Sequence, residues 1–96
     1  MSTTAFLLFR RGTSLWAVPG EQVGGLEAQG DTVCVRLATT GLWADEVVGL
    51  ARGLEVRPVG ALLRRFWRVR CRGVAVHDGV PLVVVDAENP PRALTE

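Results

Sequence analysis

The chain has 96 residues, of which 48% are hydrophobic and 22% charged, and its formal net charge is +1. A chain of this length forms one domain, and its hydrophobic content excludes an intrinsically disordered protein. The near-zero net charge gives no overall field that would favour nucleic acid or an acidic membrane.

The cysteine content and the first residues bear on the cellular compartment. Cys34 and Cys71 are the two cysteines, fewer than a small secreted disulfide scaffold uses, so reduced thiols are favoured over a disulfide. Residues 1–4 lack the basic region of a signal peptide, and the apolar runs are far shorter than the ~20 residues that span a bilayer. We therefore expect a cytoplasmic protein with no membrane insertion.

The first third of the chain predicts a hairpin and a further extended segment. Residues 5–11 are apolar on both faces up to two arginines, which is typical of a strand in the middle of a sheet or barrel. Residues 14–18 return as the second strand of this hairpin, across a turn at 12–13. A short strand around 23–28 and a turn at 30–31 are expected to follow.

Residues 31–50 are the segment over which the other strands are expected to close. Within 33–37 large apolar side chains alternate with Cys34 and Arg36, the period of a strand with one buried face. A turn at 39–41 precedes a second apolar strand, and the acidic pair at 45–46 interrupts this strand before it continues.

The segment after this central hairpin is less regular. Residues 54–57 alternate in polarity and predict a half-exposed strand that ends at Pro58, which lacks a backbone donor. Residues 60–66 are expected to form at most one helical turn.

The last third predicts a second clear hairpin. Residues 67–77 alternate, with Gly73 expected to mark a bulge or a close backbone approach, and Asp78-Gly79 is a strong hairpin turn signal. Residues 80–86 are the last strand. Residues 1–4 and 90–96 are expected to be flexible tails, with a helical turn as the alternative at 92–96. Six or seven short strands predict an all-β barrel or sandwich.

Catalytic residues are scarce. His77 precedes a turn and is expected to be an exposed strand-end residue. Asp45 and Glu46 are sequence neighbours and would point to opposite faces of a strand, so a catalytic dyad is not expected there. Motifs for a nucleophile, a metal or a phosphate-binding loop are missing from the sequence. We therefore expect no enzyme, no cofactor and no metal.

An arginine-rich stripe occupies residues 64–72, with five of the eleven arginines. On the predicted strand Arg68, Arg70 and Arg72 share one face. Three interpretations remain open: a solvated face that discourages edge pairing, a contact surface for an acidic protein, and a nucleic-acid interface. The last is the least favoured because no stacking aromatic residue interleaves on that face.

Read in order, several weak motifs resemble the CheW-like domain of bacterial chemosensory systems. The opening FLLFRRGTSLWAVPGEQVGGL is similar to that family's first hairpin, and VCVRLATTGLWADEVVGL to its central strand–turn–strand. The family's G-L-x-x-D-x-V run and its closing hairpin are matched at Gly41, Leu42, Asp45, Val47, Gly73, Val74, Ala75, Gly79, Leu82 and, displaced by one residue, Asp86.

The resemblance implies a fold of two small SH3-like β-barrel subdomains side by side. The chain departs from the family because it passes from Leu26 straight to Asp31, without the R-G-x-x-x-P-V-x-D-L segment found there. An abbreviated CheW-like fold is therefore expected, in which this internal deletion reduces one barrel. Such shortening is similar to that of a divergent branch of the family in the frizzy motility system.

The resemblance also implies a function. It predicts a noncatalytic adaptor of a chemotaxis or motility complex that binds the signalling tip of a cytoplasmic chemoreceptor, with histidine-kinase binding weakened or lost. Other CheW-like proteins are further candidate partners. The candidate contacts are apolar positions that flank the expected groove between subdomains, which can equally be plain core, together with the arginine face: Val23, Leu26, Leu42, Val47, Val48, Arg68, Arg70 and Arg72.

Two alternatives from other classes remain. A small barrel could bind nucleic acid through residues 64–72, in which case binding would weaken steeply with salt. Unpaired strand edges left by the missing segment could instead drive self-association into a homodimer by strand exchange.

Overall fold

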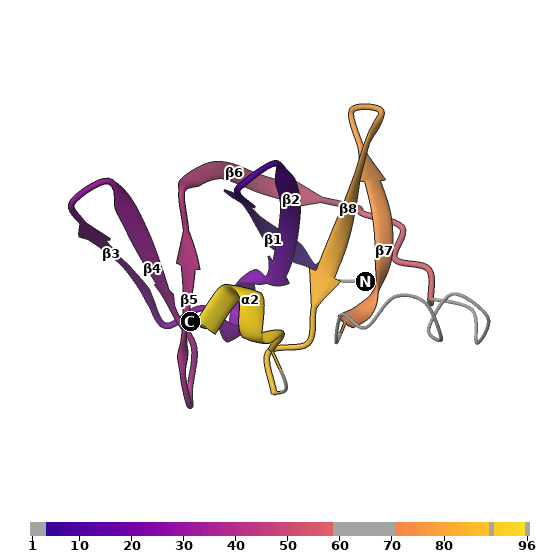
Figure 1. Cartoon of the computed structure of the whole chain (residues 1–96). Helices are drawn as coiled ribbons and strands as arrows, with labels where there is room; N and C mark the ends of the chain where they lie inside the picture. The colour runs from indigo at the N-terminus through magenta and orange to yellow at the C-terminus, as the bar shows by residue number, and fades with distance from the viewer. Residues whose placement is uncertain (1–3, 59–70, 89, 96) are drawn as a thin grey trace.

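The structure, a computed structural model, describes residues 4–58, 71–88 and 90–95 (Figure 1). Its elements are β1 (Ala5–Arg11), β2 (Ser14–Pro19), the 3₁₀ turn η1 (Gly20–Gln22), β3 (Gly25–Gln29), β4 (Thr32–Arg36), β5 (Gly41–Ala44), β6 (Glu46–Arg52), β7 (Cys71–His77), β8 (Val80–Val85) and the helical turn α2 (Arg92–Thr95).

The strands of the described residues form two sheets. The larger has the order β6-β1-β2-β8-β7, and all its neighbours are antiparallel except β2 and β8. The smaller has the order β3-β4-β5 and is antiparallel throughout. In Figure 1 the β3–β4 hairpin projects on one side of the molecule and the β7–β8 hairpin on the other. The all-β prediction and the first and last hairpins are confirmed.

The expected barrels are not seen, because in the described part of the chain both sheets are open. β6 and β7 are the two edges of the larger sheet and do not pair with each other. The smaller sheet has too few strands to close on itself. The structure therefore agrees with the all-β prediction but has two open, packed sheets in place of barrels.

The main hydrophobic core lies between the two sheets. Phe9 and Val18 from the larger sheet pack with Val35 and Leu42 from the smaller one, and all four side chains are fully buried. A second cluster, which includes Leu8 and Val84, covers the other face of the larger sheet. Residues 6–9 of β1 are buried on both faces, as the apolar run before its two arginines predicted.

The central segment divides between the sheets. β4 and β5 form the predicted hairpin, but after Asp45 the chain leaves the smaller sheet and β6 pairs with β1. Asp45 is therefore the corner between the sheets, and residues 46–52 do not continue the hairpin strand.

The predicted strand at 54–57 is wrong. Gly53, with φ of +73°, ends β6, and only Arg57 forms a bridge, to Val74. The ladder cannot continue through Pro58, which has no N–H to donate. The predictions for residues 60–66 and 67–70 lie outside the described residues.

Two glycine positions confirm the expectations for the last hairpin. Asp78 and Gly79 have φ values of +51° and +78°, as a tight turn with left-handed residues requires. Gly73 lies at a register irregularity of β7, and a Cβ atom added there would collide with the carbonyl oxygen of Arg57.

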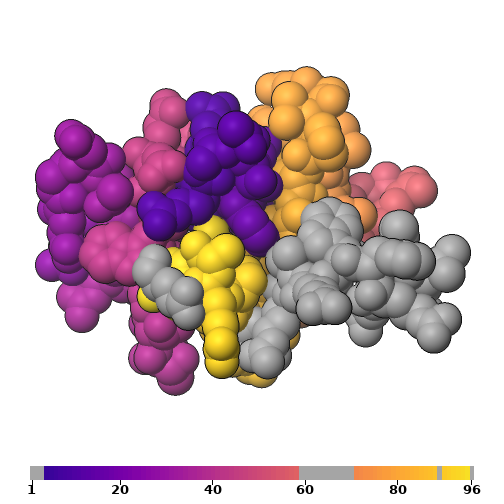
Figure 2. Space-filling model, in the orientation of Figure 1, coloured from indigo at the N-terminus to yellow at the C-terminus, as the bar shows by residue number. Residues whose placement is uncertain are grey.

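The end of the chain packs against the smaller sheet. Of the two alternatives for residues 92–96, the structure has the helical turn, α2, whose Leu94 is fully buried in the main core. Figure 2 shows this yellow segment against the magenta surface of β5 and its neighbours. Within the described residues, no helix is long and apolar enough to cross a membrane.

Candidate functional site

An apolar groove of about 410 Å³ lies where β3 faces the β1–β6 edge of the larger sheet. Among the described residues that line it, none has a charged or polar side chain. The lining residues are Leu7, Gly20, Val23, Leu26, Val47, Gly49 and Leu50. The groove offers a surface for apolar contact, and this described lining contains no group that could act as an acid, a base or a nucleophile.

A β-bulge in β6 forms one wall of the groove. Phe9 pairs with Val47, but Leu8 pairs with Gly49, so Val48 is an extra residue in β6. Residues three apart in a regular strand point to opposite faces. The bulge changes this parity, and Val47 and Leu50 therefore lie on the same face.

Val23 and Leu26 form the opposite wall. The N–H of Val23 donates to Gly20 O at 3.1 Å and closes η1, and the N–H of Gly24 donates to Arg36 O at 2.7 Å. These two bonds fix the segment between the sheets, so Val23 packs against the main core. Leu26 follows at the start of β3, opposite Val35.

The rim of the groove is unusually exposed for aliphatic side chains. Leu26 is 50% exposed and Leu50 is 67% exposed. Large apolar side chains that gather around a hollow mark a contact surface more often than single scattered ones do. The groove is therefore the candidate docking surface of this chain.

Three of the predicted contact residues, Val23, Leu26 and Val47, are brought together in the groove. Leu42 is not available for contact, because it is fully buried in the core, and its role as a candidate contact residue is corrected to a core role. Val48 is 46% exposed but sits in the bulge outside the lining.

Leu7 and Leu50 also line the groove, but the sequence analysis did not predict them as contact residues. The signal for Leu50 was the glycine at position 49, since glycine within a strand often marks a bulge.

Of the arginine face, Arg72 is exposed on β7, whereas Arg68 and Arg70 lie outside the described residues. Arg72, the one arginine of the stripe that the structure describes, is not among the residues that line the groove.

The acidic pair at the corner between the sheets has structural partners. Asp45 accepts hydrogen bonds from the Gly12 N–H at 2.6 Å and from Arg11 at 3.2 Å, and Glu46 pairs with Arg10 at 2.9 Å. Over the part of the chain that the structure describes, no three His, Cys, Asp or Glu side chains gather as a metal site would need.

No protein-family model matches the chain, and no curated protein matches it in sequence. The groove and the order of motifs along the chain are therefore the grounds on which a function is proposed.

Proposed function

We propose that this chain is a noncatalytic adaptor of a bacterial chemosensory complex, a shortened CheW-like protein that binds the signalling tip of a cytoplasmic chemoreceptor. The observation that carries the proposal is the groove. Three of the five apolar contact positions suggested by the resemblance, Val23, Leu26 and Val47, line one apolar hollow, although they come from separate segments.

The arrangement of sheets supports the family assignment in outline. In this proposal the larger sheet and the smaller sheet correspond to the two SH3-like subdomains, and β3-β4-β5 is the subdomain reduced by the missing segment. The groove then occupies the expected seam between subdomains. A cytoplasmic location belongs to the same proposal.

The shape and chemistry of the groove favour a helical partner. An amphipathic helix presents apolar side chains three and four residues apart and lays them into an aliphatic groove. A chemoreceptor tip is a coiled-coil hairpin in this proposal, so its exposed apolar side chains would meet Leu26 and Leu50 at the rim. Kinase binding is proposed to be weak or absent, because the missing segment would form part of the kinase-docking surface.

The proposal is tested by a binding panel with the full chain immobilised. Receptor signalling domains from the same genome, the kinase regulatory domain and an unrelated coiled coil are each titrated by surface plasmon resonance. We expect saturable micromolar binding to at least one receptor domain and none to the unrelated coiled coil. Absence of binding to every receptor domain would contradict the adaptor, and micromolar kinase binding would contradict the proposed loss.

A further inference from the structure

The segment that follows β8 ends in α2, which packs against β5 (Figure 2). Among its described residues the buried side chains are Ala87, Pro91 and Leu94. Leu94 is fully buried in the main core, whereas Arg92 and Ala93 before it are exposed. Leu94 is therefore the one buried side chain of α2, and its contacts hold the turn in place.

The hydrogen bonds of this segment, as far as the structure describes it, are all local. They run from the Glu88 N–H to Oδ1 of Asp86 at 3.1 Å, from the Leu94 N–H to Pro91 O at 3.1 Å, and from the Thr95 hydroxyl to Arg92 O at 3.4 Å. Between the described residues after position 85 and either sheet there is no backbone hydrogen bond and no ion pair. Apolar burial therefore attaches these residues to the sheets.

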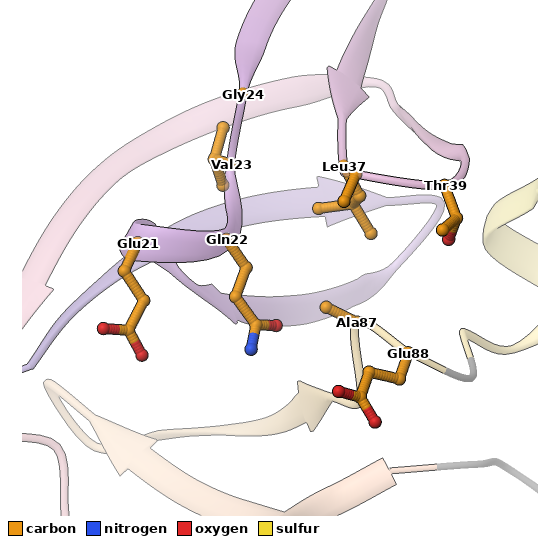
Figure 3. A pocket seen from close by; sticks show the side chains of 9 residues that line it. Glu21, Gln22, Val23, Gly24, Leu37, Thr39, Ala87 and Glu88 are labelled. Atoms are coloured by element: carbon orange, nitrogen blue, oxygen red, sulfur yellow. The ribbon is translucent and has the colours of Figure 1, made fainter.

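Part of the segment also borders an open space. A hollow of about 600 Å³ lies between Ala87 and Glu88, the connection from β4 to β5, and η1 with the residues after it (Figure 3). Figure 3 shows Ala87 and Leu37 on separate segments at the edge of this space. A segment with few buried contacts and no hydrogen bonds to its surroundings is the kind that opens locally at low cost.

We propose that residues 90–95 form a C-terminal latch, closed by Leu94, that opens while both sheets stay folded. Opening removes Leu94 from the main core and breaks no described hydrogen bond to a sheet. Burial of one leucine corresponds to a factor of about 20 to 200, so about 0.5–5% of the molecules have the latch open. A minor state of this size is large enough for a partner to select. The latch does not depend on the adaptor function, because no described residue after β8 lines the docking groove.

The test is native-state hydrogen exchange of the ¹⁵N-labelled full chain, followed by NMR at urea concentrations below the unfolding transition. A single helical turn is unstable by itself in water, so the Leu94 N–H loses its bond to Pro91 O when the latch opens. We expect the Leu94 amide to be protected about 20-fold to 200-fold. Urea should leave this protection nearly unchanged, because local opening exposes little surface.

The reference amides are those of Ala17 and Val18 in β2, which has a strand on each side. They should be protected about 1,000-fold or more, and urea should reduce this protection, since they exchange through global unfolding. Equal protection and an equal urea dependence for Leu94 and these amides would overturn the proposal. Protection of Leu94 below about threefold would also overturn it, because the latch would then not be closed.

A charge in place of Leu94 should hold the latch open. In the Leu94→Asp variant the amides of Ala17 and Val18 should lose no more protection than the factor measured for Leu94 in the wild type, because the sheets stay folded without the latch. Ala93→Asp places the same charge at the exposed neighbour and should change the protection of Leu94 by no more than about threefold. Unfolding of the Leu94→Asp variant, or a larger loss at Ala17 and Val18, would show that α2 is an inseparable part of the core and would overturn the proposal.

Discussion

The backbone N–H of Gly12 donates a 2.6 Å hydrogen bond to Oδ2 of Asp45. Gly12 lies in the turn of the first hairpin, and Asp45 is the single residue between β5 and β6. The N–H of Asp45 also donates to Arg10 O at 2.8 Å. The contact therefore fastens the tip of the β1–β2 hairpin to the corner where the chain passes from one sheet to the other.

Replacing Asp45 by alanine should lower the free energy of unfolding by about 1–2 kcal/mol, because the Gly12 N–H loses its partner. Its ion pair with Arg11 should contribute little of this, since the Asp45 side chain is 46% exposed. Urea unfolding followed by tryptophan fluorescence measures the change. The matched control is Glu46→Ala, which removes an exposed ion pair with Arg10 and should cost less than about 0.5 kcal/mol. Equal losses in the two variants would contradict this role for Asp45.

Replacing Gly73 by alanine should destabilise the last hairpin. The added Cβ atom would collide with the carbonyl oxygen of Arg57 and approach Cγ1 of Val56 at 2.9 Å. The resulting backbone shift should cost about 1–3 kcal/mol, measured by thermal or urea unfolding. Gly25→Ala is the matched control, because nothing lies within 4 Å of its added Cβ atom, and we expect it to leave stability nearly unchanged. An unaffected Gly73→Ala variant would show that the Arg57–Val74 bridge does not form in solution.

Replacing Leu94 by alanine tests whether the C-terminal turn belongs to the fold. Leu94 is fully buried in the main core, so truncation should cost about 2–5 kcal/mol through lost burial and a cavity. Ala93→Ser changes the exposed neighbour in the same turn and should cost no more than about 0.5 kcal/mol. Wild-type stability in the Leu94→Ala variant would indicate that the end of the chain is detached in solution, as the tail expectation implied.

Local patterns predicted most of the strands. The apolar run of residues 5–11, the alternation of 33–37 and the turn signal of Asp78-Gly79 each act over a few neighbouring residues, and all three are confirmed. The prediction for Gly73 is also confirmed, because a glycine within an alternating strand usually lies at a bulge or at a close backbone approach. These predictions depend on the backbone and on side-chain period alone.

Pairing between distant strands could not be predicted in the same way. At the corner where β6 leaves the smaller sheet, Asp45 bonds to Gly12, 33 residues away, a contact that no local pattern reveals. The alternation of 54–57 does not give a strand, because Gly53 turns the chain and Pro58 has no N–H to donate. For the same reason, only some of the residues that line the groove could be predicted. Val47 was found by its motif, but Leu50 reaches the groove only through the bulge at Val48.

The bulge also allows a direct test of the groove. It places Leu50 in the groove and leaves Val48, on the same strand, outside the lining. Leu50 lies in the groove and is 67% exposed, whereas Val48 lies outside the lining and is 46% exposed. An aspartate at either position should cost no more than about 1 kcal/mol of folding stability, the span of strand propensities, because neither side chain belongs to the buried core. Leu50→Asp should weaken receptor binding about 30-fold, because it sets a charge against the apolar side chains of the partner.

The matched variant Val48→Asp should leave the affinity for the receptor domain within about twofold of wild type, because Val48 is not among the residues that line the groove. Leu26→Asp, on the opposite wall, should behave like Leu50→Asp. Surface plasmon resonance with the same receptor domain measures all three, with circular dichroism as the check on folding. If Val48→Asp reduced binding as strongly as Leu50→Asp, the partner would contact the edge of β6 and not the groove between the sheets.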